Sequence, residues 1–367
     1  MPSFAIEVEG GTSPLTKQEV LLVLQRAGDS NQLNLTASTQ QLANWEKIPG
    51  YYATLQDIYG DFALPPSLRL LSIIQLKNGI DKHWRKTTIN SIGKDEKNTI
   101  KTKAVQLGIL EPVPALALHN ALMLAKIVRH EFPHDWPDVF STIAKQLRTA
   151  ASDLSQRQYA YNILVITLQV IKELASGRLQ RTRKSLQQVS SELLKALGDL
   201  YVDSVTTWTT SYDAETARVS HSALKSLRRL LIVGFEHPHR ESEVTQFWTV
   251  LQDHHQRFLD LSTSADEAKD YATKHVLQLS KLFLEMARDH PASFVLLGST
   301  GILTRCWGLI SHTDARPSLQ SKSVSLIYIG SVYHECCGTS LTHNGWRSPQ
   351  AYIRASSDDA LGLGRVS

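Results

Sequence analysis

Apolar residues recur at intervals of three and four along most of the chain, and this pattern predicts amphipathic helices. The clearest example is the segment 65–86. Its apolar stripe consists of Ile73, Leu76, Ile80 and Trp84, which fall on one face of a helix. The two prolines at its start suit the first turn, where the missing N–H costs nothing. We therefore expect one helix over residues 66–86, with its stripe in the core.

Three polar residues of the same segment, Lys77, Asn78 and Asp81, lie away from the apolar stripe. From the residues alone, the plainest interpretation is a solvated helix face on which Asn78 bonds the adjoining loop. The alternative is a surface offered to a partner, and the choice between them depends on further information.

The same periodicity predicts helices along the rest of the chain. Capping boxes, in which a Ser or Thr precedes a Glu or Gln by three residues, predict helix starts at Thr16 and Ser38. The expected helices cover residues 16–27, 38–48, 51–59, 66–86, 94–109, 114–130, 136–150, 156–176, 180–207, 214–234, 241–261, 266–290 and 294–311. No convincing alternation of the kind that strands show is present.

These helices form a repeat of pattern rather than of sequence. The more buried members start near residues 66, 114, 156, 214 and 266, at intervals close to those of HEAT and armadillo units. A pair of helices cannot bury its own apolar face, so successive pairs must stack. The predicted fold is an all-α, right-handed superhelical solenoid of HEAT-type (ARM-like) helix pairs, with six pairs and half of a seventh.

The two ends of the chain lack this pattern. Residues 1–14 are expected to be disordered, and residues 313–367 are expected to form a non-repeat tail, because Gly, Ser and polar residues dominate there. The tail offers no obvious polar cap for a solenoid. We expect it to be disordered or the aberrant ending of a longer protein.

Composition excludes several classes of protein. The 39 basic and 35 acidic residues give a net charge of +4, which is too balanced to indicate direct nucleic-acid binding. Three cysteines without a wide, even spacing argue against a disulfide-stapled secreted fold. The most apolar stretch, 294–310, is interrupted by Gly and Arg and is too short for a membrane span. No signal peptide is visible at the start.

Candidate chemistry is weak. His237 and His239 flank a proline, and His254 and His255 are adjacent and cannot both face one ion from a helix. A His-Glu-Cys-Cys group at 334–337 lacks the spacing that lets two thiolates converge on zinc. The phosphate-loop, nucleophile-elbow, zinc-protease and dinucleotide motifs are all missing from the sequence. We expect neither an enzyme nor a metal or other cofactor.

A basic run, Arg178-Leu-Gln-Arg181-Thr-Arg183-Lys184, precedes and opens the expected helix 180–207. Positive charge at a helix start works slightly against the helix dipole. The run is either a solvated helix start or a surface for an acidic partner, and the sequence leaves both open.

Several residues resemble the amino-terminal domain of importin-beta-type nuclear transport receptors (karyopherins). The matching positions are Leu42, Trp45, Pro49-Gly50, Leu55, Leu76-Lys77-Asn78 and Trp84. The stretch 81–85, with Phe132-Pro133 and Trp136-Pro137, is most similar to the importin-eleven branch. The resemblance covers about residues 15–312, of which 15–110 correspond to the amino-terminal, Ran-binding domain and 111–312 to further HEAT repeats.

The resemblance implies a function without catalysis. Receptors of this family bind protein cargo, pass the pore through Phe-Gly nucleoporins, and respond to the GTP-bound form of Ran. They occur in the nucleus and cytoplasm and at the nuclear pore, with no insertion into membranes. The helices 38–48, 66–86, 114–130 and 156–176 would line the concave surface that holds Ran. The implied Ran contacts are Gln41, Asn44, Lys77, Asn78, Asp81, Asn120 and Arg129.

The chain is much shorter than members of that family, which leaves a second hypothesis. In this alternative the protein is a truncated HEAT-repeat scaffold without transport activity. The receptor hypothesis predicts binding to Ran in the GTP form, and the scaffold hypothesis does not.

Overall fold

The computed structural model describes residues 15–28, 32–176, 180–263, 268–299 and 302. These residues are helical or lie in turns and short loops, and none of them belongs to a strand. They form two compact units, which divide between Glu236 and His237. The all-α prediction is confirmed. The predicted helix 294–311, the zinc-like group at 334–337 and the expected tail lie wholly or largely outside the described residues.

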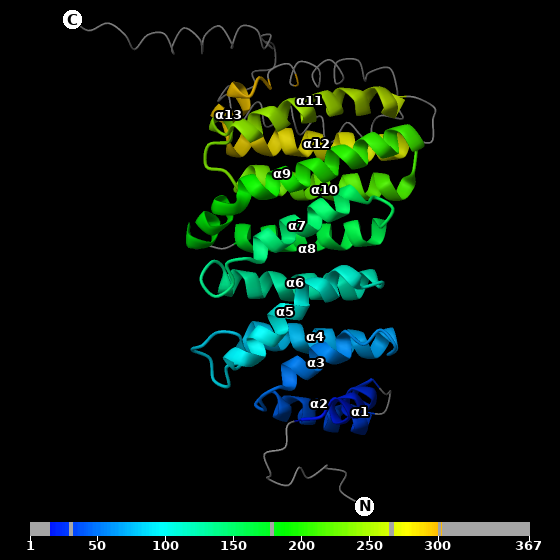
Figure 1. Cartoon of the computed structure of the whole chain (residues 1–367), viewed down its shortest axis with the longest axis vertical. Coiled ribbons are helices and arrows are strands. Elements are labelled where there is room, and N and C mark those ends of the chain that lie inside the picture. The colour runs from blue at the N-terminus through cyan, green and yellow to red at the C-terminus, as the bar shows by residue number, and fades with distance from the viewer. Residues whose placement is uncertain (1–14, 29–31, 177–179, 264–267, 300–301, 303–367) are drawn as a thin grey trace, which may run out of the picture. The chain divides into compact units, whose positions relative to one another are not determined.

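The first unit is a stack of helix pairs (Figure 1). The helices are α1 (Lys17–Ala27), α2 (Gln32–Trp45), α3 (Tyr51–Tyr59), α4 (Pro66–His83), α5 (Lys94–Leu110), α6 (Pro114–Glu131), α7 (Val139–Ser152), α8 (Arg157–Ser176), α9 (Gln180–Ser211) and α10 (Ala214–Val233). Each odd-numbered helix packs against the even-numbered helix that follows it. The predicted HEAT-type pairing is therefore present.

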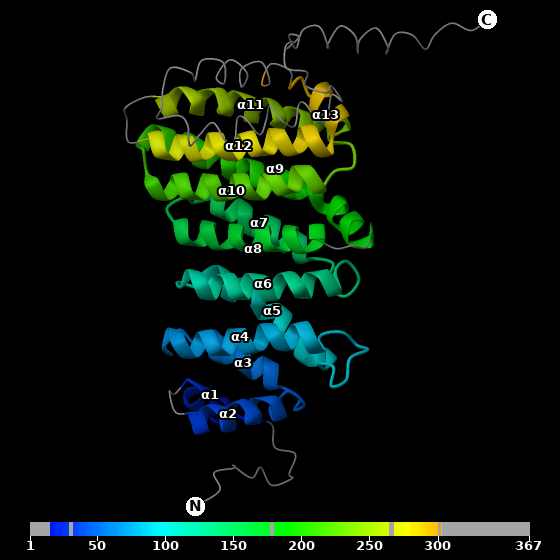
Figure 2. The ribbon, with the colours of Figure 1, turned by 180° about the vertical axis from the view of Figure 1, so that it is seen from behind.

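The even-numbered helices α4, α6, α8 and α10 also contact one another in order along the stack (Figure 2). We call these helices, with α2, the second-helix layer. The odd-numbered helices behind them make contacts from α1 to α3, from α3 to α5 and from α7 to α9, and α5 contacts α8 as well as α6. Every internal helix therefore covers the apolar stripe of a neighbour, as a solenoid requires.

The stripe of α4 lies in the core, as predicted. Ile73, Leu76 and Ile80 are fully buried and Trp84 is 1% exposed. Gly79 lets α4 approach α3 closely, because a Cβ atom there would lie 2.0 Å from the ring of Tyr52. The sequence placed the stripe correctly because its spacing is that of a single buried helix face.

Several predicted helix boundaries are wrong, and three of them show why. Helix α2 already begins at Gln32, so Ser38 is a buried residue within it rather than its cap. Helix α4 ends at His83, and the chain then turns back so that the Ile92 N–H donates to the His83 carbonyl. Helix α7 begins at Val139, after turns at 132–138. In each case a local sequence signal was overridden by the path of the chain.

The second unit contains a short 3-10 helix and one complete pair of α-helices. A 3-10 turn (Pro238–Arg240) precedes α11 (Ser242–Thr263) and α12 (Lys269–Asp289), which pack against each other. Helix α13 (Pro291–Leu296) follows, and Gly298 adopts a positive φ of 72° just after it. The predicted helix from residue 294 thus starts earlier and is broken near Gly298. None of the described helices has the length and apolarity that a membrane span needs.

Candidate partner-binding face of the second-helix layer

The predicted contact residues of α2 differ in exposure. Gln41 is half-buried and Asn44 is exposed. The Oδ1 atom of Asn44 accepts a hydrogen bond of 3.3 Å from Nε2 of Gln40, one turn earlier. This bond is between neighbours on one helix surface, so it leaves Asn44 accessible to a partner.

Lys77 and Asn78 on α4 are the most available of the predicted contacts. Lys77 is half-buried and Asn78 is exposed. Neither side chain makes a hydrogen bond or ion pair with another described residue. Burial, and then the charge of Lys77, lower the pKa of His119 on α6, so Lys77 lies near the neighbouring helix of the layer. These two side chains have unused polar groups at the surface.

Asp81 and Arg129, by contrast, already have partners on the next helix. Asp81 of α4 pairs with Lys126 of α6 at 2.8 Å, and Arg129 of α6 pairs with Glu173 of α8 at 2.7 Å. Both pairs lie at least partly in solvent, where an ion pair contributes about 0.2–1 kcal/mol. A partner protein could therefore break either ion pair and contact Asp81 or Arg129 at a small cost in free energy.

These pairs join residues one repeat apart. The separations are 45 residues for Asp81 and Lys126 and 44 for Arg129 and Glu173. Similar separations recur in Lys17–Asp61, Asp57–Lys103 and Arg148–Glu192. The partners Lys126 and Glu173 were not predicted from the sequence. The signal that could have found them is opposite charge at the repeat spacing of about 45 residues.

Asn120 is fully buried and cannot contact a partner, so its prediction as a Ran contact is wrong. Its Nδ2 atom donates to the Ala104 carbonyl at 2.9 Å, and a Cβ atom on Gly108 would lie 2.2 Å from the same nitrogen. Asn120 therefore fills the space where α6 crosses α5 and satisfies a backbone carbonyl there. A polar residue on an otherwise apolar helix has a structural role here.

The remaining candidates have simple placements. Trp45 and Trp84 are buried, as predicted. Arg183 and Lys184, in the first turns of α9, are exposed, whereas residues 177–179 lie outside the described range. No group of three or more metal-ligating side chains occurs in the described part of the chain. The His237 and His239 rings are 6.1 Å apart, and His239 Nδ1 lies 2.8 Å from Ser293 Oγ.

The helices α2 to α5 carry a recognisable domain. Residues 38–109 match the sequence model of the importin-beta N-terminal domain. The chain is also 32% identical over 300 residues to "Importin beta-like protein KAP120" of Saccharomyces cerevisiae, which covers 79% of this chain and 29% of that protein. Human importin-11 is 28% identical over 288 residues, or 76% of this chain and 29% of importin-11.

Solved structures of nuclear transport receptors are also similar to this chain. The chain is similar to Lph2 of S. cerevisiae, described as a bidirectional nuclear transport receptor, with a TM-score of 0.79 and 29% identity over 93% of this chain and 34% of that one. The exportin Cse1 in its cargo-free, cytoplasmic state has a TM-score of 0.69 at 15% identity over 94% of this chain and 36% of Cse1, which is evidence for the fold alone.

The chain spans less than a third of the length of the curated relatives named above. The domain match over residues 38–109 includes most of α2, all of α3 and α4 with its buried stripe, and nearly all of α5. The domain match, the relatives and the shared fold together show that the chain belongs to the importin-beta family, on the branch of importin-11.

Proposed function

We propose that this protein is the Ran-binding, amino-terminal part of a nuclear transport receptor. The observation that carries the proposal is the match of residues 38–109 to the importin-beta N-terminal domain. The matched helices present polar side chains on the second-helix layer, where Lys77 and Asn78 have no partner among the described residues. A receptor of this kind acts by binding, and it needs no catalytic group.

The proposed Ran surface consists of exposed and half-buried side chains of three helices. They are Gln41 and Asn44 of α2, Lys77, Asn78 and Asp81 of α4, and Arg129 of α6. Binding there would use the free groups of Lys77 and Asn78 directly. Asp81 and Arg129 would contribute only by leaving Lys126 and Glu173, so their contributions are smaller.

Transport would follow from linkage between two ligands. If Ran in its GTP form and cargo favour different curvatures of one helical stack, then each weakens the binding of the other by the same factor. The ion pairs of neighbouring repeats are suited to such adjustment, because surface pairs can break and form again at about 0.2–1 kcal/mol each. Protein cargo, Phe-Gly nucleoporins, and shuttling between nucleus and cytoplasm through the pore are part of this proposal.

A binding measurement with purified Ran tests the proposal. The full chain is immobilised, and Ran loaded with a non-hydrolysable GTP analogue or with GDP is passed over it. We expect saturable binding of the GTP-analogue form and much weaker binding of the GDP form. If neither form binds, the receptor proposal fails for this chain, and the scaffold hypothesis remains.

Charge reversal locates the surface. Lys77→Glu should weaken Ran binding at least about tenfold, because it puts a like charge where a complementary one is expected. Lys145→Glu is the matched control, since Lys145 is an exposed residue of α7 in the other helix layer. Equal affinities of the two variants would remove Lys77 from the surface. Circular dichroism verifies that both variants are folded.

A further inference from the structure

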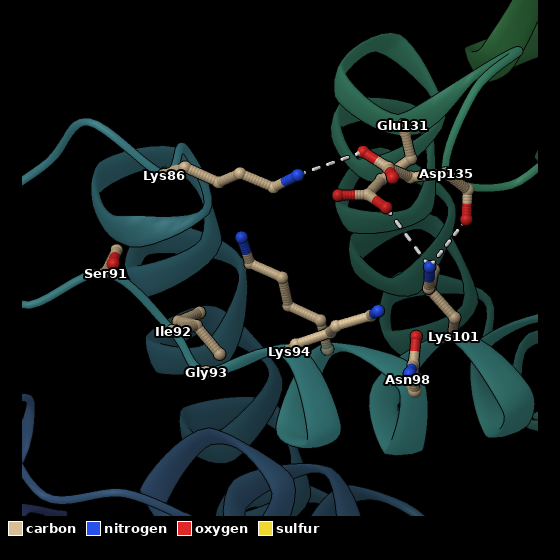
Figure 3. A pocket seen from close by; sticks show the side chains of 10 residues that line it. Lys86, Ser91, Ile92, Gly93, Lys94, Asn98, Lys101, Glu131 and Asp135 are labelled. Carbon is tan, nitrogen blue, oxygen red and sulfur yellow. Dashed lines mark hydrogen bonds and ion pairs between the residues drawn. The ribbon is translucent and has the colours of Figure 1, made fainter.

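Four lysines surround one pocket at the start of α5. The pocket has a volume of about 370 Å³ and is lined by Lys86, Ser91, Ile92, Gly93, Lys94, Lys97, Asn98, Lys101, Glu131 and Asp135. These residues come from the chain after α4, from the first turns of α5, and from the end of α6 with the turn that follows. Figure 3 shows Lys86 and Lys101 approaching the two carboxylates from different sides.

The carboxylates of Glu131 and Asp135 already have partners within the protein. Glu131 accepts a hydrogen bond of 2.9 Å from Trp84 Nε1 at one oxygen, and its other oxygen lies 3.1 Å from Lys101 Nζ. Asp135 pairs with Lys86 at 3.6 Å, and its backbone carbonyl accepts from Lys101 at 2.9 Å. Lys101 and Lys86 are therefore neutralised within the pocket wall.

Lys97 is the unusual member of the group. Only 5% of Lys97 is exposed, and the residue lines the pocket. Its ammonium group lies 5.3 Å from the centre of the Trp84 ring and makes no hydrogen bond or ion pair with any described residue. Burial lowers the pKa of Lys97, and the nearby Glu131 only partly opposes this. Burying a cation without a hydrogen-bonding partner is costly, so an anionic ligand beside Lys97 would be stabilised.

The start of α5 adds to this positive potential. Gly93 is the N-cap residue of this 17-residue helix and, with Lys94, lines the pocket. The N-terminus of a helix offers free N–H groups and a partial positive charge to an anion. The first turn of α5 carries two acids, Asp95 and Glu96, and neither lines the pocket. The Glu96 carboxylate instead accepts hydrogen bonds from backbone N–H groups of Gly50, Tyr52 and Ala53 at 2.8–3.0 Å, with the longest bond to Ala53.

We propose that this pocket binds a small, soluble phosphate ester, and that the Lys97 ammonium is the central group that contacts the phosphate. Four lysines against two carboxylates leave an excess of two positive charges, which matches a phosphate dianion. The acceptor oxygens of a phosphate group point in several directions, so they can meet Lys97, Lys94 and the start of α5 together. The pocket volume leaves room for a small organic group beyond the phosphate. The pocket residues differ from the proposed Ran contacts, so phosphate binding and Ran binding can be tested independently.

Titration calorimetry with inorganic pyrophosphate as the probe tests the proposal on the full chain, at low ionic strength held constant with potassium chloride. We expect saturable binding of one pyrophosphate per chain. Lys97→Met should weaken it at least about tenfold, because a charged hydrogen-bond donor is lost while the apolar stem is kept. Lys103→Met is the matched control. Lys103 is on the same helix, but it lies outside the pocket and pairs with Asp57.

A second variant covers the case in which Lys97→Met does not fold. Lys86 and Lys94 are exposed, so Lys86→Gln with Lys94→Gln removes two positive charges of the pocket without changing the core. This double variant should also weaken pyrophosphate binding several-fold. Absence of saturable binding to the unmodified chain at millimolar pyrophosphate would overturn the proposal. So would equal affinity of the pocket variants and Lys103→Met.

Discussion

Arg69 and Lys97 are two buried cations of the same unit, and their surroundings differ. Arg69 is 2% exposed, and its Nε atom donates to the Tyr59 carbonyl at 2.8 Å. Its Nη2 atom forms an ion pair with the fully buried Glu111, and the guanidinium lies 4.7 Å from the centre of the Phe62 ring. Lys97 has only an aromatic ring against it. Arg69 therefore has an ion-pair partner and hydrogen bonds, and Lys97 has neither among the described residues.

The difference separates two uses of a buried charge. A charge with a paired partner and hydrogen bonds holds elements together, since removing one partner leaves the other uncompensated. Arg69 joins α4 to the end of α3 and to Glu111, which follows α5. A charge that borders a pocket without such a partner is instead suited to a ligand. Substitutions that remove each charge should therefore have very different effects on stability.

The largest effect is expected for Arg69→Met. It leaves the Glu111 carboxylate buried without its cation, which should lower the free energy of unfolding by about 3–5 kcal/mol. Urea unfolding followed by circular dichroism measures the loss. Adding Glu111→Gln should restore part of the stability, because the uncompensated charge is then gone. A loss of less than about 1 kcal/mol for Arg69→Met would contradict the structural role assigned to this pair.

A buried group of the second unit gives a smaller effect that depends on pH. Burial lowers the pKa of His275 to about 4, although its Nδ1 lies 2.7 Å from the Tyr271 carbonyl. The unfolded chain, with a pKa of about 6.5 for histidine, binds the proton first. Stability is therefore unaffected above about pH 6.5 and falls as the pH is lowered toward 4, by of the order of 1–3 kcal/mol.

Hydrogen exchange of α11 and α12, followed by mass spectrometry and corrected for the intrinsic rates, measures this acid limb. His254 acts in the same direction, because burial lowers its pKa to about 4 as well. His275→Gln should flatten the decline while leaving protection near neutral pH within about 1 kcal/mol. An unchanged decline in this variant would mean that His275 is not among the groups responsible.

The smallest effect is expected for Lys97→Met. Its ammonium leaves no described partner behind, its burial is costly, and methionine keeps the buried stem. The free energy of unfolding should therefore stay unchanged or rise slightly, by less than about 1 kcal/mol. The same urea unfolding experiment measures it beside Arg69→Met. A loss above about 2 kcal/mol would show that Lys97 is a structural cation like Arg69, and the contrast between the two would disappear.

Local patterns predicted the helices well, because each stripe is a property of one segment. The α10 stripe of Val219, Ala223, Leu227 and Leu230 is buried as the spacing indicates. The same patterns placed helix ends less well. Ser38 has the spacing of a capping box, yet α2 is already two turns long at that point. A capping box is a local signal, and it can also occur within a helix that began earlier.

The candidate site was predicted less completely than the fold. The family resemblance implied Asn120 as a Ran contact, but the crossing of α6 and α5 buries it. The pocket was also not predicted from the sequence. Lys94, Lys97 and Lys101 have the spacing of one helix face, which was an available signal. That Lys97 is buried while Lys94 is exposed depends on Trp84 and the turn after α4.

The sequence by itself determined that the chain is a stack of helix pairs and carries importin-beta family features, because helix periodicity and local motifs are written in short segments. Only the tertiary structure decided which charges meet. Asp81 forms an ion pair with Lys126, and Arg129 forms one with Glu173, each across about 45 residues of chain. Such contacts depend on how far each helix rotates against the next, and this rotation is set by packing between segments rather than by any one of them.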